Sequence, residues 1–299
     1  MPQLQYHRAF AMVKSVRLSL VVVLCAAAAI AAGCGGKQEN EPAVATPSIT
    51  LSKDRVPIGS AVTITYKFVV EPNATFDKDY YAFVHVLDPE GEQMWTEDHL
   101  PPTPTSQWKA GQTIEYQRTI FVPNYPYIGE AHVRLGLYDP PSSRRLVLKA
   151  EDKGRREYEV KKFQILASSE NIFLIYEGWH AAEVDVKNPQ NEWLWTKKNA
   201  TLKFRNPKKD ATLYLRYDAR VDLFTPPQQV LLKIGDQTVG QFTADAKSPT
   251  LVTIPLSAAQ FGQADMVDLV FDLDRTFKPD GGDTRELGIR VFNAYIEPK

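Results

Sequence analysis

The 299-residue sequence has only two cysteines and no basic excess. After residue 33, no segment has a helical apolar repeat longer than about 12 residues. Two cysteines exclude a disulfide-dense scaffold and a metal site built from several thiolates. Lys plus Arg total 35 and Asp plus Glu total 36, a balance that argues against nucleic-acid binding. The 43% hydrophobic content is too high for a disordered chain. The length is sufficient for about two domains.

The N-terminal 33 residues have the parts of a secretory signal peptide. Lys14 and Arg17 precede an almost wholly apolar stretch at 18–33. This stretch is shorter than the roughly 18–20 apolar residues of a spanning helix, so a cleaved signal is favoured over a permanent membrane segment. Translation from Met12 would give a compact basic segment of its own, so the true start is either Met1 or Met12.

The apolar stretch ends in Ala31-Ala32-Gly33-Cys34, which resembles the lipobox of bacterial lipoprotein signal peptides. The resemblance implies that the Cys34 thiol takes a diacylglyceryl group and that a type II signal peptidase cuts before this residue. It also implies that the new amine is often acylated, for example with palmitate. Ala31 departs from the more usual Leu, and an ordinary signal peptide cut after an Ala-x-Ala is the alternative. Gly35 replaces the Asp that retains such proteins at the inner membrane, which favours the outer membrane in a cell that has two.

A lipid on Cys34 would anchor the protein to a membrane without spanning it, since two or three acyl chains hold firmly where one is marginal. Cys25 would leave with the signal peptide, so no internal disulfide is expected. Cleavage would leave 32 basic and 36 acidic residues, a net charge of −4. Such a chain is not drawn to an anionic surface by charge. Residues 34–47, rich in Gly, Pro and polar side chains, are predicted to form a flexible tether.

From Ser48 onward, apolar and polar residues alternate with period two, which predicts short strands separated by Pro, Gly, Asp and Asn turns. The predicted strands are 61–70, 81–88, 113–122, 131–139, 157–166, 200–205, 212–221, 229–234, 237–243, 250–254, 267–273 and 287–296. Pro89-Glu90-Gly91 and Gly235-Asp236 predict hairpin turns. Only residues 257–261 suggest a helical turn.

Many short strands with almost no helix predict an all-β fold of two tandem antiparallel β-sandwiches, immunoglobulin-like or jelly-roll-like. A small polar stretch, Ala167-Ser168-Ser169, separates them. The predicted organisation is a signal peptide (1–33), a lipidated tether (34–47), an N-terminal sandwich (48–167) and a C-terminal sandwich (168–299).

Parts of both halves resemble known modules. Segments 83–88, 98–99, 104–111 and 136–139 resemble immunoglobulin-like β-sandwich modules attached to bacterial envelope glycosyltransferases and found in surface lipoproteins. Segments 193–196, 200–202 and 279–288 resemble a second accessory sandwich of similar company. The resemblance covers most of residues 80–148 and 179–292. It implies the fold, and since these modules have no agreed catalytic residues, it assigns none here.

No catalytic or metal-binding motif stands out. The sequence lacks the nucleophile elbow, the phosphate-binding loop and the zinc-protease motif. Four histidines remain after signal cleavage, too dispersed for ligand spacing. They are His85, His99, His132 and His180. No metal or cofactor is therefore expected.

Carboxylates gather between residues 265 and 286. A calcium site and a paired-carboxylate glycosidase are the functional interpretations. The structural interpretation places Asp272 and Asp274 on a solvated strand face and pairs Asp283 with Arg285 to hold the loop. The sequence favours this structural interpretation, because the spacing matches no EF-hand.

Aromatic side chains are the better functional indication. Trp193 and Trp195 lie two residues apart, so on a strand they would face the same side. Sugar rings stack their apolar faces on flat indoles. Tyr125 and Tyr127 flank Pro126 in an aromatic loop. These four residues are the candidate ligand-binding residues, with core packing as the alternative for the tryptophans.

The sequence as a whole predicts a lipid-anchored cell-envelope protein that acts as a non-catalytic binding or assembly module. Its partner would be an envelope glycan or a protein in the same membrane, and not a nucleic acid. Two alternatives remain open. One is a hydrolase that uses carboxylates such as Asp280 or Asp283, and the other is a purely structural spacer.

Overall fold

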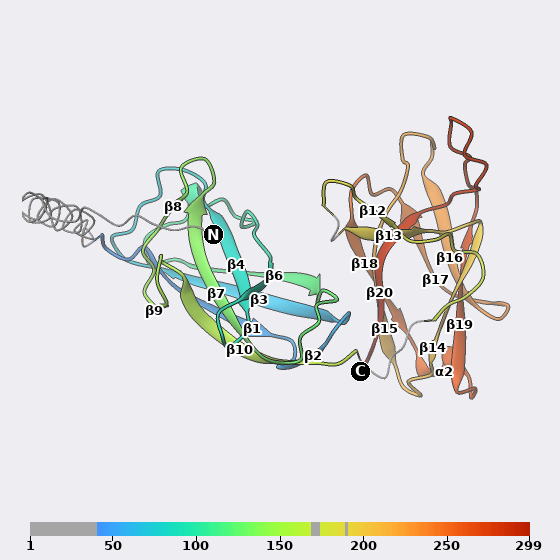
Figure 1. The fold of residues 1–299 in the computed structure, drawn as a ribbon, viewed down its shortest axis with the longest axis horizontal. Helices are drawn as coiled ribbons and strands as arrows, with labels where there is room; N and C mark the ends of the chain where they lie inside the picture. The colour runs from blue at the N-terminus through green and yellow to red at the C-terminus, as the bar shows by residue number, and fades with distance from the viewer. Residues whose placement is uncertain (1–40, 169–173, 189–190) are drawn as a thin grey trace, which may run out of the picture. The chain divides into compact units, whose positions relative to one another are not determined.

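The strands group into two β-sandwiches in the computed structural model, which describes residues 41–168, 174–188 and 191–299 (Figure 1). Strand pairing in these ranges joins residues 45–166 with one another and residues 174–298 with one another. The only regular helices among them are one short α-helix and one 3-10 turn. The predicted all-β class is therefore confirmed.

The N-terminal sandwich has the strand order of an immunoglobulin-like fold. One sheet has the order β1-β3-β6 and the other β2-β10-β7-β4-β5. β2 runs parallel to β10, and the other neighbours in both sheets are antiparallel. The bounds are β1 (Ala45–Leu51), β2 (Arg55–Pro57), β3 (Ala61–Val70), β4 (Tyr81–Leu87), β5 (Gln93–Thr96), β6 (Thr113–Phe121), β7 (Gly129–Asp139), β8 (Arg144–Arg145), β9 (Glu151–Asp152) and β10 (Tyr158–Leu166). The 3-10 turn is η1 (Thr105–Gln107). Each of the two sheets contributes one face to a shared core.

Alternation explains why these segments form strands. In β3, Ile64, Tyr66 and Phe68 are buried and the residues between them are more exposed. Trp108 follows η1 and packs on Phe68 with ring centroids 5.1 Å apart. Its indole N–H donates to the carbonyl oxygen of Thr103, 2.9 Å away. The indole thus ties the proline-rich loop 98–105 to the core.

The C-terminal sandwich pairs two five-stranded sheets, β11-β14-β19-β16-β17 and β12-β13-β20-β15-β18. From β13 to β16 and again from β17 to β20 the chain changes sheet at every step, which is a jelly-roll pattern. The bounds are β11 (Leu174–Ile175), β12 (Glu183–Val184), β13 (Glu192–Trp195), β14 (Asn199–Arg205), β15 (Ala211–Asp218), β16 (Gln228–Ile234), β17 (Gln237–Ala244), β18 (Thr250–Leu256), β19 (Met266–Leu273) and β20 (Arg290–Pro298). The helix is α2 (Ala258–Phe261).

Two predicted turns form as the sequence indicates. Gly235 adopts φ 57° in the two-residue connection between β16 and β17, where Ile234 pairs with Gln237. Only glycine enters that left-handed region without a steric cost. Helix α2 begins with a capping box in which Ser257 and Gln260 each satisfy the other's backbone N–H.

The predicted tether boundary needs a correction, because β1 begins at Ala45 rather than after residue 47. Ala45, Pro47 and Ile49 are buried in alternation, and Ala45 is fully buried against the N-terminal core. The alternation is hard to recognise in the sequence because a small residue and a proline occupy the first two inward positions. Residues 45–47 therefore belong to the first strand.

Several short strands were also absent from the prediction, among them β2, β5 and β13. Segments of three or four residues are too short for a period of two to stand out, and tertiary pairing alone defines them. Cys25, Cys34 and the predicted signal peptide lie outside the described residues. Within the part of the chain that is described, no helix has the length and apolarity needed to cross a bilayer.

Candidate functional site

The outer face of the sheet β12-β13-β20-β15-β18 gathers aromatic and polar side chains. Along β15, Leu213, Leu215 and Tyr217 point into the core. Arg216 therefore points to the opposite face, because side chains alternate along a strand. Its directly paired residues, Asn293 on β20 and Leu251 on β18, lie on the same face.

A β-bulge adds one more side chain to this face. Arg216 pairs with Asn293 and Tyr217 pairs with Val291, so Phe292 is left without a partner on β15. Such an extra residue shifts the alternation of a strand by one position. Val291 and Ala294 consequently pack on the core side. The bulge leaves Phe292 and Asn293 next to each other on the outer face.

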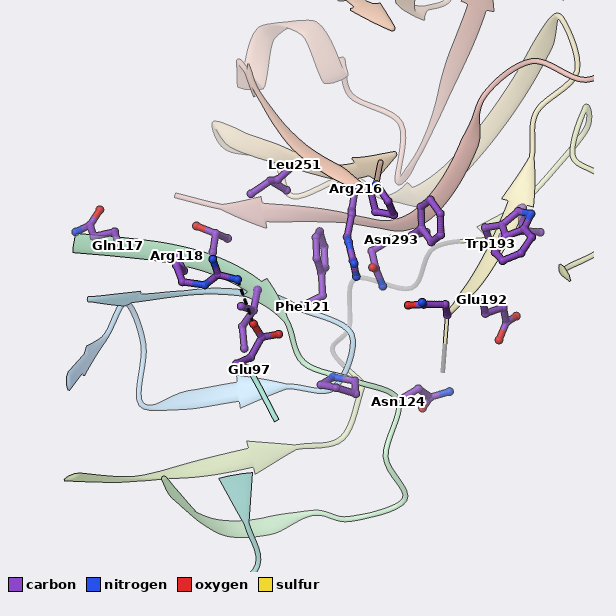
Figure 2. A pocket seen from close by; sticks show the side chains of 17 residues that line it. Glu97, Gln117, Arg118, Phe121, Asn124, Glu192, Trp193, Arg216, Leu251 and Asn293 are labelled. Atoms are coloured by element: carbon purple, nitrogen blue, oxygen red, sulfur yellow. Dashed lines mark ion pairs between the residues drawn. The ribbon is translucent and has the colours of Figure 1, made fainter. Parts of the chain in front are cut away.

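These positions form a row across four strands, which we call the aromatic–arginine row: Trp193, Phe292, Asn293, Arg216 and Leu251. All five residues line the pocket in Figure 2, together with others such as Gln117 and Phe121 of β6. Since neighbouring strands lie about 4.8 Å apart, the row from β13 to β18 spans roughly 14 Å. That length suits an extended oligomeric ligand.

Arg290 organises the aromatic end of the row. Its guanidinium carbon lies 4.8 Å from the Trp193 ring centroid and 5.7 Å from that of Trp195. Both side-chain nitrogens that face Asp218 are 2.6 Å from its carboxylate oxygens, a bidentate pair. Asp218 is only 1% exposed. The buried acid thus fixes the cation, and the cation fixes the orientation of both indoles.

The two predicted tryptophans do share a face, but the structure gives them different surroundings. Trp195 is 8% exposed and meets Phe277 edge-on at 5.6 Å, so it belongs to the packing. Trp193 is half-buried, lines the pocket and contacts Phe292 at 5.9 Å. Its indole N–H is buried and has no hydrogen-bond partner in the described structure.

Four residues of the row were not predicted from the sequence: Arg216, Phe292, Asn293 and Leu251. A local pattern could not have found them, because their common face depends on the pairing of β15 with β20 and on the bulge. Val291 and Phe292 of β20 are both apolar, so the sequence does not indicate which of the two side chains points outward.

The other predicted ligand-binding residues lie elsewhere, in the loop between β6 and β7. Tyr127 donates its hydroxyl hydrogen to the carbonyl oxygen of Glu130 at 2.9 Å and covers Gly129. It therefore closes its own loop. Tyr125 is 36% exposed. Neither tyrosine lines the pocket that contains Trp193.

The carboxylate-rich loop is held by ion pairs. Asp283 pairs with Arg285 at 2.7 Å, and Arg285 also reaches Glu183 at 2.6 Å. Hydrogen bonds from Arg285 lower the pKa of Asp283 to about 2. Asp272 pairs with Lys233 on the neighbouring strand. These contacts agree with the structural interpretation, and the described residues contain no group of three side chains suited to a metal.

In the N-terminal sandwich, His99 is buried in an aromatic cluster with Tyr66 and Tyr116. Its Nδ1 lies 2.7 Å from the carbonyl oxygen of Glu97, which can only accept, so Nδ1 carries a proton. Its Nε2 lies 2.9 Å from the Tyr116 hydroxyl. Burial, with a smaller contribution from the charge of nearby Arg118, lowers the pKa of His99 to about 4. The imidazole is therefore neutral at pH 7.

We predict that Asp218→Asn destabilises the C-terminal sandwich by roughly 2–3 kcal/mol, because it leaves Arg290 without its anion. The loss stays below that of a fully buried pair, since the Arg290 side chain is 31% exposed. Urea unfolding followed by tryptophan emission measures both the stability and the indole environment. Asp222→Asn is the matched control, because Asp222 and its partner Arg220 are both well exposed, and no measurable change is expected. Equal stability of Asp218→Asn and wild type would contradict the role of this pair.

We also predict that His99 makes stability depend on pH between 6.5 and 4. In the unfolded chain the imidazole takes up a proton near its ordinary pKa of 6.5, whereas in the folded chain it does so near 4. The unfolded state binds more protons than the folded state in this pH range. The contribution of His99 to the free energy of unfolding is therefore lost as the pH falls, and the loss reaches roughly 3 kcal/mol near pH 4. His99→Gln should remove that part of the decline. Free energies of unfolding measured for both proteins at pH 7 and pH 4 test this, and an equally steep decline in the variant would refute it.

No protein-family model matches this sequence, and no curated protein sequence does either. Among solved structures, the alkylpurine DNA glycosylase AlkC of Pseudomonas fluorescens bound to DNA aligns with 40% of this chain and 31% of its own, at 11% identity and a TM-score of 0.26. The M60 catalytic domain with the CBM51-1 and CBM51-2 domains from Clostridium perfringens ZmpB aligns with 80% of this chain and 34% of its own, at 8% identity and a TM-score of 0.23. The chain thus spans about a third of each of these structures.

A structure of carbohydrate-binding modules from the β-sandwich superfamily aligns with 85% of this chain and 99% of its own, at 10% identity and a TM-score of 0.23. The structures that resemble this chain thus include β-sandwich domains and carbohydrate-binding modules. At such low scores and identities they carry no argument about a ligand. The β-sandwich fold is defined by the strand pairing described above.

Proposed function

We propose that this protein is a lipid-anchored, non-catalytic module of a bacterial cell envelope that binds a glycan on the aromatic–arginine row. The observation that carries the proposal is the row itself. Trp193 and Phe292 offer apolar ring surfaces, and Arg216 and Asn293 beside them offer hydrogen-bond donors. A sugar needs this combination, because its ring has apolar C–H faces and its rim has hydroxyl groups.

The position of the row supports binding by a rigid surface. Each member belongs to, or directly follows, a paired strand, and strands hold side chains more precisely than loops do. The ion pair of Asp218 and Arg290 further fixes the aromatic end. A preorganised face loses little conformational freedom when a flexible chain of sugars binds.

A non-catalytic role is supported by the state of the acidic loop. Glycoside hydrolysis needs two carboxyl groups facing one bond. Asp283 is instead held by Arg285, which is itself shared with Glu183. The loop therefore serves as a braced connection in this proposal, and binding on the row is the activity.

The membrane anchor is the second half of the proposal and rests on the lipobox-like sequence before Cys34. The first strand begins at Ala45, so about ten residues would separate a lipidated Cys34 from the folded part. The lipid would hold the protein at the membrane while the sandwich binds its glycan.

Replacing Trp193 with Ala should weaken glycan binding roughly tenfold or more, because a central aromatic contact would be lost. The test uses a glycan array and then calorimetry with the soluble fragment from Gly35 onward, which retains every strand. Tyr176→Ala is the matched control, since Tyr176 is an exposed aromatic residue beside β11 of the other sheet. No glycan bound by the wild type across a broad array, or equal binding by Trp193→Ala, would refute the proposal.

Replacing Cys34 with Ala should abolish incorporation of a labelled fatty-acid analogue and release the protein from the membrane fraction. The physical reason is that the thiol is the attachment point of the diacylglyceryl group in this proposal. Cys25→Ala is the control, because this residue would be removed with the signal peptide, so labelling should persist. Label that stays on Cys34→Ala, or a wild type without label, would contradict the anchor.

A further inference from the structure

Two arginines lie on the same face of the sheet β12-β13-β20-β15-β18, and they differ in one respect. Arg290 is neutralised by a bidentate pair with the buried Asp218. Arg216 has no carboxylate within ion-pair distance anywhere in residues 41–168, 174–188 and 191–299. Its guanidinium carbon lies 5.7 Å from the Phe292 ring centroid, and its charge also acts on the Glu97 carboxylate without forming an ion pair with it. Arg290 is therefore part of an ion pair of the fold, whereas Arg216 has no ion pair among the described residues.

The groups beside Arg216 also lack partners. The Asn293 side chain, directly opposite on β20, has no hydrogen bond to any residue that the structure describes. The Trp193 indole N–H is buried and unpartnered in the same part of the structure. Buried polar groups are nearly always paired, so an unpartnered N–H is exceptional in a residue that lines the pocket. Guanidinium and indole are donors only, and the amide supplies two more N–H groups.

One acidic side chain that lines the pocket already has an ion-pair partner. Glu97, which also lines it, pairs with Arg118 at 3.6 Å. Burial raises the pKa of the Glu97 carboxyl, and the charges of Arg118 and, to a smaller extent, Arg216 oppose that rise. Glu192, the first residue of β13, is exposed and also lines the pocket, and it has no ion pair with Arg216. Glu97 is thus ion-paired with Arg118, and Arg216 has no ion pair of its own among the described residues.

We infer that the glycan bound on the row carries a carboxylate, as a hexuronic acid residue does, and that Arg216 binds this carboxylate. The inference rests on the proposed glycan binding and names its chemical class. A guanidinium fork matches the planar carboxylate with two parallel hydrogen bonds. One unpaired arginine balances one negative charge, whereas a phosphate monoester carries nearly two. The sugar ring would stack on Trp193 and Phe292, with Asn293 donating to a neighbouring oxygen.

The test measures binding of the soluble fragment from Gly35 onward to a panel of hexuronic acid oligosaccharides by calorimetry. Each oligosaccharide is paired with its carboxyl-reduced neutral form, and sulfated and phosphorylated oligosaccharides are further arms. We expect a uronate oligosaccharide to bind roughly 10- to 100-fold more tightly than its reduced form, the range for a charge-assisted contact. This difference should shrink as salt screens the charge.

Arg216→Gln should remove the preference for the acidic form, so that the acidic and reduced forms bind with similar affinity. Arg216→Lys should restore part of it, since it keeps the charge without the fork. Arg220→Gln is the matched control, because Arg220 is an exposed arginine already paired with Asp222. Thermal unfolding of each variant checks that the fold is intact.

The outcomes separate the inference from the proposed function. Equal binding of acidic and reduced forms, a preference that survives Arg216→Gln in a folded variant, or binding confined to sulfated or phosphorylated sugars would overturn the carboxylate inference while glycan binding stands. No binding of any oligosaccharide would overturn the proposed function and the inference together.

Discussion

A buried carboxylate and the cation that neutralises it shape the functional face of this protein. Asp218 lies at the end of β15 and is almost fully buried, where an unpaired charge would be costly. Arg290 meets it with two short hydrogen bonds and then spreads its planar guanidinium against Trp193 and Trp195. Because the guanidinium has two faces and an edge, one residue satisfies the acid and orders two indoles.

The same face shows how a sheet separates structural from ligand-facing groups. Side chains that point inward from β15 and β20 are aliphatic or aromatic and belong to the core. The bulge at Phe292 breaks this alternation once, and it does so beside Arg216. Bulges often re-aim a side chain next to a binding site. Here the bulge gives the face an aromatic ring and an amide at consecutive positions, which a regular strand does not allow.

The larger features of the fold follow from the sequence because they depend on short-range patterns. Segment 61–70 coincides with β3 to the residue, whereas segments such as 113–122 and 131–139 differ from their strands at one end. The glycine turn at Gly235 forms a hairpin. The first strand was predicted to start too late because Ala45 and Pro47 are weak apolar signals. Short strands such as β13 depend on a neighbour to pair with, so their own four residues give no periodic signal.

For the candidate site too, some features follow from the sequence and others only from the tertiary structure. The sequence by itself determined that the chain is built of short alternating strands, that Trp193 and Trp195 share a face, and that Asp283 has Arg285 within reach. These statements depend only on residues close together in the chain. Only the tertiary structure decided that Trp195 is packed while Trp193 lines a pocket, and that Arg216 and Phe292 join it. The physical reason is that register across β13, β20, β15 and β18 brings together residues up to about 100 positions apart, and a bulge can reverse which of them face outward.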